Sequence, residues 1–508
     1  MSVPTSKIFS MSNGQAMDVG NATGMRCGDF CESIIEAVKQ GLRISALFGR
    51  PIEGGRVRLW AVLSHDSKSV ILLLYTDIDG DRYDSITSYC TQAHWFEREI
   101  FEQWRVRPSG HPWLKPIRFH APYRDCEAEN SGKGLPEIGV ADFYRVEGDE
   151  VHEVAVGPVH AGIIEPGHFR FQCHGENVFH LEISLGYQHR GVERKLTGGP
   201  DRRTVHYMET LSGDTTIGHT LAYSELIEGL GGTSVPAKAQ VLRGVALELE
   251  RIANHTGDLG ALAGDVGYLP TLSYCGRIRG DVLNMTALIC GNRFGRGLVR
   301  PGGTGFDIDG QRRDELLRRL DTLEKDLSVA VGLLWNSSSV KARFEGTGAI
   351  GKEECMAMGL VGPAARACGI ERDIRSDMPH GIFQLDQIPV STCRTGDVFA
   401  RGYVRWLEIQ RSIAFVREQL KGLPGGSERA DVRPLEPGRI GVSLVEGWRG
   451  EICHVALTDS DGKFAGYKVV DPSFHNWFGL AYALRGQQIS DFPLCNKSFN
   501  LSYCGHDL

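Results

Sequence analysis

The chain has 508 residues, more than one hydrophobic core normally contains, so we expect two or more domains. Its composition, 41% hydrophobic and 23% charged, is that of an ordinary globular protein. The formal net charge of −7 argues against nucleic acid as a partner, because phosphate binding needs a concentrated basic surface. No apolar run approaches the roughly 18–20 residues that cross a bilayer, and the N-terminus lacks the apolar core of a signal peptide. Any work at a membrane would therefore require docking onto membrane partners.

The first part of the chain is predicted to contain a disordered tail, a compact α/β domain and a linker. Residues 1–25 are polar and small, which favours disorder. Residues 26–125 form the domain. Its expected elements are a helix over residues 32–41, strands over residues 56–64 and 69–76, and a helix that begins over residues 95–101. Residues 126–150 are predicted to be a linker, because their first half is rich in Gly, Asn, Ser and Glu.

The rest of the chain, residues 151–508, is predicted to be mainly helical. Apolar stripes at spacings of three and four residues indicate long helices packed side by side. The three clearest stripes cover residues 236–252, residues 316–334 after a start near Asp309, and residues 406–420 before a Leu-Pro-Gly-Gly stop. These stripes indicate core packing and carry no information about chemistry.

Thirteen cysteines are scattered along the chain. Only Cys27 and Cys31 stand close together, as CxxxC, and no second pair of ligands lies near them in the sequence. Reduced thiols are the default for a cytoplasmic chain of this length. We therefore expect neither a metal site at this pair nor a framework of disulfides.

Several segments resemble one family, in the family's own order. Residues 95–112 (WFEREIFEQWRVRPSGHP) resemble the signature of the 30-kDa subunit of respiratory complex I. Later segments resemble the large subunit of group 4 nickel–iron hydrogenases and its relative, the quinone-facing 49-kDa subunit of complex I. These segments are VGPVH (156–160), PGHFR (166–170), GYQHRGVE (186–193), LAYSELIE (221–228), ELERIANHTGDLG (248–260), GLVGPAARACG (359–369), DIRSDMP (373–379) and DFPLCNKSFNL (491–501). The resemblance implies an α+β fold, with a small N-terminal α/β domain followed by a mainly α-helical domain of the hydrogenase large-subunit type.

The departures from the family pattern concern the nickel ligands. Where the hydrogenases carry CGxC before the LAY helix, this chain has Ser212 and Thr215 at the two cysteine positions. Where they carry CYSC after the NKSF segment, it has Ser502 and Gly505, with Cys504 displaced by one residue. A nickel–iron centre needs soft thiolates, and neutral hydroxyl groups replace them poorly. The resemblance therefore implies four vacated ligand positions and no metal or other cofactor bound by this chain.

Complex I shows, through the resemblance, what such a cavity can become: the inner part of a quinone chamber. Asp265 matches the buried aspartate of that chamber, and His255 lies ten residues upstream on the same predicted helix. A carboxylate beside a histidine would let a proton follow an electron onto a quinone oxygen, because histidine titrates near neutral pH. The alternative is an aspartate at a helix end that only satisfies backbone amides.

The segment GPVHAGIIEPGHFR holds two further candidates. His168 is the nearest match to the chamber histidine of complex I, although the frame differs by two residues and Ser212 occupies the chamber's tyrosine position. His160 matches the first histidine of the family segment. It is a candidate for cofactor binding, and a purely structural role is the alternative.

Glu193, in HRGVE, matches the glutamate that relays protons from the nickel site in hydrogenases. A buried glutamate suits this task because desolvation raises its pKa. The alternative is a salt bridge with Arg190 or Arg194. Three arginines match family positions that line the cavity: Arg366, Arg375 and Arg449.

We therefore expect an oxidoreductase subunit of a membrane-associated complex, peripheral on the cytoplasmic face of the inner membrane. An iron–sulfur small subunit would supply electrons to a quinone-like acceptor, and antiporter-like membrane subunits would couple this to ion translocation. The alternative is a non-catalytic coupling or scaffold subunit, and a true nickel–iron hydrogenase is disfavoured. No GxGxxG follows a predicted strand, so any NAD binding would belong to a partner.

Overall fold

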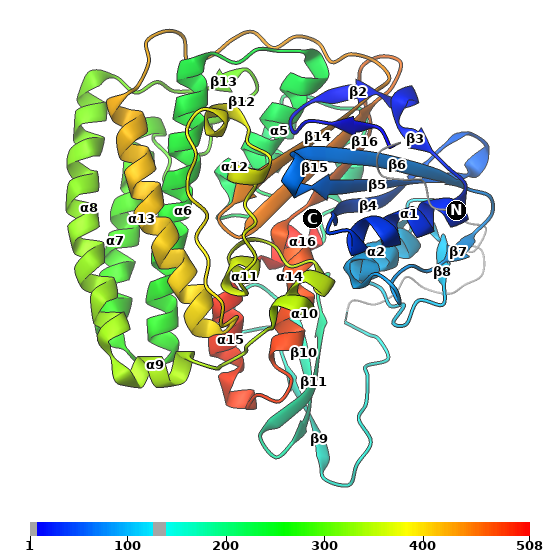
Figure 1. Ribbon diagram of the computed structural model, residues 1–508, viewed down its shortest axis with the longest axis horizontal. Coiled ribbons are helices and arrows are strands. Elements are labelled where there is room, and N and C mark those ends of the chain that lie inside the picture. The colour runs from blue at the N-terminus through cyan, green and yellow to red at the C-terminus, as the bar shows by residue number, and fades with distance from the viewer. Residues whose placement is uncertain (1–7, 125–138) are drawn as a thin grey trace.

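The computed structural model describes residues 8–124 and 139–508 (Figure 1). The fold is α+β, as predicted. A bundle of long helices and an α/β domain lie on opposite sides of a central antiparallel sheet, and a three-stranded sheet projects below them in the view of Figure 1. The central sheet therefore joins the parts of the molecule that the sequence places far apart.

The α/β domain is built on an antiparallel sheet against which two helices pack. Its main strands are β4 (Arg43–Pro51), β5 (Val57–His65) and β6 (Val70–Ile78), its helices are α1 (Cys27–Lys39) and α2 (His94–Trp104), and a parallel pair is formed by β7 (Arg82–Asp84) and β8 (Arg107–Ser109). The two predicted strands and both predicted helices are confirmed. Strand β4 was not predicted, because residues 43–49 are all buried and show no alternation of polar and apolar side chains.

The prediction of a disordered N-terminus is wrong for residues 8–25. Strands β1 (Ser10–Met11) and β3 (Thr23–Gly24) pair with β6, while β2 (Ala16–Asp18) pairs with β14 (Arg439–Gly447) of the central sheet. The segment thus ties the two ends of the chain together. Residues 1–7, and residues 126–138 of the predicted linker, lie outside the described residues. Residues 139–150 contain no helix or strand.

The three-stranded antiparallel sheet follows the predicted linker. Its strands are β9 (Val151–Val156), β10 (His168–His174) and β11 (Asn177–Ser184). The loop of residues 157–167 connects β9 to β10. Two short helices, α3 (Val192–Leu196) and α4 (Thr204–Met208), then lead the chain toward the central sheet.

Long helices form the bundle, and all three predicted stripes lie on them. The helices are α6 (Ala237–Asp265), α7 (Leu269–Cys290), α8 (Gly310–Asn336) and α13 (Val398–Lys421). The Asp309 side chain accepts the Arg312 N–H at the start of α8, as an N-cap residue should. Shorter elements complete this region: β12 (Val299–Arg300), β13 (Gly303–Thr304), α9 (Ser338–Phe344), α10 (Lys352–Met358), α11 (Gly362–Ala367) and α12 (Ile374–Asp377). Among the helices that the structure describes, none combines the length and apolar character that a bilayer span requires.

The central sheet brings three distant segments together. It contains β14, β15 (Gly450–Thr458) and β16 (Phe464–Val470), and α5 (Thr216–Gly231) packs against β14 and β15. The chain then continues through α14 (Pro472–Ala483), α15 (Phe492–Phe499) and α16 (Tyr503–Asp507). As a result, the residues before α5, the β14–β15 turn and the start of α16 meet in the interior.

Candidate functional site

Three hydroxyl side chains meet where α5 and α16 begin, and we call them the hydroxyl cluster: Ser212, Thr215 and Ser502. The Ser212 hydroxyl donates to Ser502 Oγ over 2.9 Å, and the Thr215 hydroxyl lies 3.5 Å from Ser212 Oγ. Ser502 caps α16 by accepting the backbone N–H of Gly505 over 2.9 Å. Each hydroxyl residue is only 1% exposed. The structure therefore brings together the four positions that the sequence had singled out, although they lie up to 293 residues apart (505 − 212).

A guanidinium group contacts this cluster. Arg449, in the β14–β15 turn, forms a two-pronged ion pair with Asp214, with Nη1 and Nη2 at 2.5 and 2.8 Å from the two carboxylate oxygens. The same Nη1 lies 3.3 Å from Ser212 Oγ and 3.2 Å from Thr215 Oγ1, and Nε donates to the carbonyl of Asn500 over 2.6 Å. Burial alone would raise the pKa of Asp214, but the guanidinium outweighs it and holds that pKa below its ordinary value. The site therefore contains a fixed cation and a fixed anion.

Behind the cluster lies a buried carboxylate that belongs to α14. Asp471 caps α14 by accepting the Ser473 N–H over 2.8 Å, and it lies 2.9 Å from Nε2 of His219 on α5. The Ser473 hydroxyl in turn accepts the N–H of Ser502 over 2.8 Å. A Cβ at Gly505 would lie 2.7 Å from the Asp471 carboxyl group, so only glycine leaves room there. Asp471 and the cluster thus share one compact interior site.

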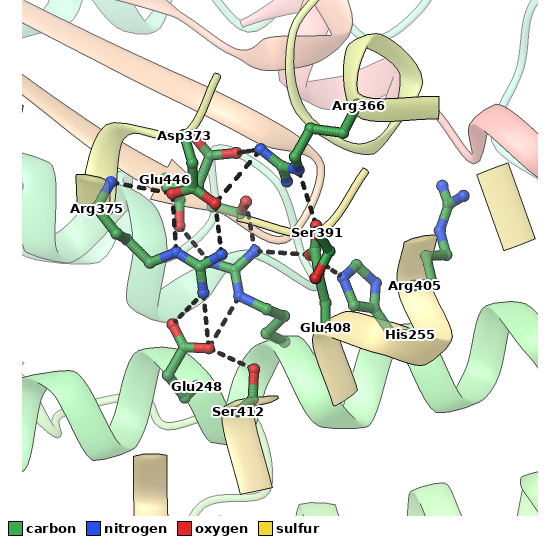
Figure 2. Close-up of polar contacts among 12 residues, drawn as sticks. Glu248, His255, Arg366, Asp373, Arg375, Ser391, Arg405, Glu408, Ser412 and Glu446 are labelled. Atoms are coloured by element: carbon green, nitrogen blue, oxygen red, sulfur yellow. Dashed lines mark hydrogen bonds and ion pairs between the residues drawn. The ribbon is translucent and has the colours of Figure 1, made fainter. Parts of the chain in front are cut away.

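Figure 2 shows a second assembly, which we call the charged cluster. It contains four carboxylates and three guanidinium groups, none more than 2% exposed: Glu248, Asp373, Glu408, Glu446, Arg251, Arg366 and Arg375. Arg375 reaches Glu248 at 3.0 and 3.1 Å and Asp373 at 2.6 and 2.9 Å. Arg366 bridges Glu408 at 2.8 Å and Glu446 at 2.7 Å. The side chains come from α6, α11, α12, α13 and β14, so the cluster joins the bundle to the central sheet.

The charges in this cluster do not cancel, because four carboxylates face three guanidinium groups. Burial raises the pKa of Glu446 to about 7, against the opposing effect of Arg366 and with a further contribution from Asp373. Burial would also raise the pKa of Glu408, but Arg366 and His255 hold it well below its ordinary value. The excess negative charge is therefore relieved at Glu446, which can carry a proton near neutral pH.

The charged cluster also positions the turn that carries Arg449. Arg251 donates to the carbonyls of Glu446 and Gly447 over 2.6 and 3.0 Å, at the end of β14. The next residue, Trp448, donates from its indole N–H to the Asp214 carbonyl over 3.0 Å and lies 3.1 Å from Thr215 Oγ1. Arg366 and Arg375, which were predicted to line a cofactor cavity, therefore hold the fold of the site through ion pairs.

His255 and Asp265 are not neighbours. His255 lies 2.8 Å from Glu408, and burial lowers its pKa against the opposing effect of that carboxylate. Asp265 is the last residue of α6, about 15 Å further along the helix at 1.5 Å per residue, and it is exposed. Partial burial of its carboxyl group raises its pKa to about 6, opposed by Lys497. The expected buried Asp265–His255 pair is thus wrong for this chain. In the described part of the chain no backbone amide donates to Asp265 either, so the alternative role is also not found.

Glu193 is buried, as expected, but its partner is not one of the predicted arginines. Its Oε1 lies 3.0 Å from Nζ of Lys468 and accepts the N–H of Val469 over 2.9 Å. Lys468 is shared with Glu99, at 2.6 and 2.7 Å. Glu193 and Lys468 both line a cavity of about 190 Å³ between the α/β domain and the central sheet.

The two histidines of the predicted segment lie at the ends of the β9–β10 loop and do not touch the hydroxyl cluster. His168 begins β10 with its Nδ1 3.4 Å from the Gly157 carbonyl, and burial lowers its pKa. His160 lies with Nε2 2.9 Å from the Gly167 carbonyl, a contact that shapes the loop. The residue of this loop that does reach the site is Glu165, which accepts the N–H groups of Tyr503 and Cys504, each over 3.3 Å.

The comparison with known proteins agrees with the resemblance seen in the sequence. Residues 31–126 match the family model of the respiratory-chain NADH dehydrogenase 30 Kd subunit, and residues 265–439 match that of the 49 Kd subunit. The carbon monoxide-induced hydrogenase of Rhodospirillum rubrum is 30% identical over 69% of this chain and 97% of its own length. Formate hydrogenlyase subunit 5 of Escherichia coli is 27% identical over 92% and 84%, and an NADH-quinone oxidoreductase subunit of Bdellovibrio bacteriovorus is 27% identical over 80% of both chains.

The chain therefore belongs to the family that unites the complex I 49-kDa subunit with hydrogenase large subunits, with a 30-kDa-type region fused ahead of it. It is a complex I-like, hydrogenase-related oxidoreductase subunit.

A nickel–iron centre, which the hydrogenase side of this family implies, does not fit the residues present. Ser212, Thr215 and Ser502 offer neutral hydroxyl groups, and the Arg449 cation lies within 3.3 Å of two of the positions where thiolates would be needed. Burial raises the pKa of the Cys504 thiol to about 11, and Glu165 adds to this, so the remaining sulfur is a neutral thiol at neutral pH. Within residues 8–124 and 139–508, no group of three or more His, Cys, Asp or Glu side chains is placed to hold a metal ion.

Proposed function

We propose that this chain is the acceptor-site subunit of a membrane-docked oxidoreductase that works without nickel. Electrons would come from an iron–sulfur cluster in a small partner subunit and pass to a quinone-like acceptor, and antiporter-like membrane subunits would couple this to ion translocation. The complex would lie on the cytoplasmic face of the inner membrane. The observation that carries the proposal is the Arg449–Asp214 ion pair among the hydroxyl groups, at positions where the hydrogenases hold metal.

The chemistry of the site suits a carbonyl acceptor better than a metal. A guanidinium group and hydroxyl groups in a water-poor interior stabilise negative charge that develops on an oxygen atom. The relatives named as hydrogenases and as NADH-quinone oxidoreductases support a redox role, and they support the involvement of partner subunits.

Exposed apolar side chains at the β9–β10 loop support docking to those partners. Val159, Ile163 and Ile164 are 76%, 86% and 51% exposed. Apolar side chains gathered on one exposed loop are characteristic of surfaces that a partner covers.

The proposal is tested by the metal content of the anaerobically purified complex, counted per copy of this chain. We expect nickel to be far below one atom per chain, and iron to be accounted for by clusters in the partner subunits. The same preparation should reduce a soluble quinone from reduced methyl viologen without evolving hydrogen. Nickel close to one atom per chain, together with hydrogen evolution, would overturn the proposal.

Asp265→Asn separates this function from a non-catalytic coupling or scaffold role. Asp265 is exposed at the end of α6 and its pKa is about 6, so it could deliver a proton to an acceptor bound between this chain and a partner. We expect the variant to lose about 100-fold in quinone reduction while the complex assembles normally. Asp281→Asn, an exposed carboxylate paired with Arg277 on the neighbouring α7, is the matched control and should keep its activity. Full activity of Asp265→Asn would favour the scaffold role.

A further inference from the structure

A chain of four buried side chains leads from the hydroxyl cluster to the opposite side of the central sheet. Asp471 Oδ2 lies 2.9 Å from His219 Nε2, and His219 Nδ1 lies 3.1 Å from His454 Nε2. His454 Nδ1 then lies 2.8 Å from the hydroxyl oxygen of Tyr467. The first three side chains are at most 1% exposed and Tyr467 is 7% exposed. They come from α14, α5, β15 and β16, so the fold holds every link between rigid elements.

Both ends of this chain have a defined destination. Asp471 adjoins the site, because it shares Ser473 with Ser502 and contacts Gly505. Tyr467 lines the cavity of about 190 Å³, together with Glu193 and Lys468. That cavity also borders residues 48–51 of the α/β domain, so it lies at the junction between the two domains. The four residues therefore connect the site with a separate cavity.

The hydrogen bonds can be assigned in one self-consistent direction with neutral imidazoles. The Tyr467 hydroxyl donates to His454 Nδ1, His454 Nε2–H donates to His219 Nδ1, and His219 Nε2–H donates to the Asp471 carboxylate. Burial lowers the pKa of His454 well below its ordinary value, and His219 adds to this, so His454 is uncharged. Each imidazole then has one donor nitrogen and one acceptor nitrogen in use, which is the arrangement that passes a proton along a chain.

We propose that Tyr467, His454, His219 and Asp471 form a reversible one-proton relay between the interdomain cavity and the hydroxyl cluster. A proton from water in the cavity binds the Tyr467 oxygen, and the Tyr467 O–H proton moves to His454 Nδ1. The His454 Nε2 proton moves to His219 Nδ1, and the His219 Nε2 proton moves to Asp471. One proton has then reached the carboxylate, both imidazoles have changed tautomer, and no heavy-atom bond is made or broken. The same steps in reverse return the proton.

The role of this relay rests on the proposed function in one respect. An electron that reaches an acceptor near Arg449 adds negative charge to a buried site, and protonation of Asp471 compensates for it without opening the site to water. The relay itself conducts protons whether or not electrons arrive. Its test can therefore be made without any electron donor.

The first measurement follows hydrogen–deuterium exchange at the imidazole N–H groups in the purified complex, with ¹⁵N-histidine in this chain, by NMR. In the wild type, deuterium that enters from the cavity should replace the His454 and His219 protons at similar rates. Tyr467→Phe removes only the hydroxyl group and should slow both exchanges about tenfold or more. Tyr223→Phe changes another buried tyrosine of the same apolar cluster and should leave both rates unchanged. Unchanged exchange in Tyr467→Phe would overturn the relay.

A second variant keeps the test decisive if Tyr467→Phe folds poorly. Asp471→Asn blocks only the inner end, so His454 should still exchange at the wild-type rate through Tyr467. Exchange at His454 that is slowed as strongly by Asp471→Asn would mean that protons enter from the site, which contradicts the proposal. Quinone reduction measured in parallel separates the two claims. If the wild-type complex shows no turnover but the exchange pattern holds, the proposed function fails and the relay stands.

Discussion

Replacing Arg449 by methionine is expected to destabilise the chain by about 2–4 kcal/mol and to abolish acceptor chemistry at the hydroxyl cluster. Methionine has a similar length but no charge, so the Asp214 carboxylate loses both of its charge-assisted hydrogen bonds. The carbonyl of Asn500 also loses its donor. The effect is smaller than for a fully buried pair, because the Asp214 side chain is 34% exposed and water relieves part of the loss.

The pH dependence of this effect has a definite sign. Arg449 holds the pKa of Asp214 below its unfolded value, so the pair contributes stability above the unfolded pKa of about 4. That contribution is lost as the pH falls through the lower, folded pKa. The difference in unfolding free energy between the wild type and Arg449→Met should therefore be largest near neutral pH and should shrink in acid. Urea unfolding of the purified chain at several pH values measures it.

Asp214→Asn is the control that isolates the ion pair. In the Arg449→Met background, it removes the uncompensated charge and should recover part of the lost stability, whereas alone it should destabilise. Additive effects of the two changes would show that the ion pair does not operate as a unit. Quinone reduction by the complex should stay low in the double variant, because neither change restores the cation.

The sequence predicted the helices well and the paired segments poorly, for a physical reason. The stripes on α6, α8 and α13 repeat every three or four residues, so each helix shows its buried face locally. Strand β2 gives no such signal, because its three residues find their partner in β14, more than 400 residues away. Strand β4 is buried on both faces and so has no alternation to detect.

The same contrast applies to the candidate site. The resemblance picked out Ser212, Thr215, Ser502 and Gly505, and the structure brings them together. It did not reveal that Asp214 pairs with Arg449, because the two residues lie 235 positions apart. A buried arginine does signal the need for a counter-charge, and the Asp214 beside Ser212 was the acid available in the matched segment.

Helix geometry alone could have separated two residues that the sequence had paired. Ten residues of helix rise about 15 Å, so Asp265 could not contact His255. The acid that does so is Glu408 on α13, a contact that depends on how two helices pack.

Replacing Arg375 by methionine is expected to have the larger effect on stability, about 3–5 kcal/mol. Arg375 is 1% exposed and makes four hydrogen bonds to two buried carboxylates, Glu248 and Asp373. Its loss would leave four carboxylates facing two guanidinium groups in an interior that water does not reach. Arg417→Met is the matched control, because Arg417 also contacts two carboxylates, Asp321 and Glu324, but these are 66% and 55% exposed. The control should lose no more than about 1 kcal/mol.

The Arg375 variant also tests what the charged cluster does for the site. If the cluster positions the β14–β15 turn, Arg375→Met should disturb Trp448, whose indole N–H contacts the Asp214 carbonyl. Tryptophan fluorescence and the exchange rate of that indole N–H should change, although no atom of Arg375 contacts the hydroxyl cluster. Adding Glu248→Gln should restore part of the stability, because it removes one uncompensated charge. A destabilised variant in which the Trp448 indole N–H exchanges as in the wild type would confine the cluster to a structural role away from the site.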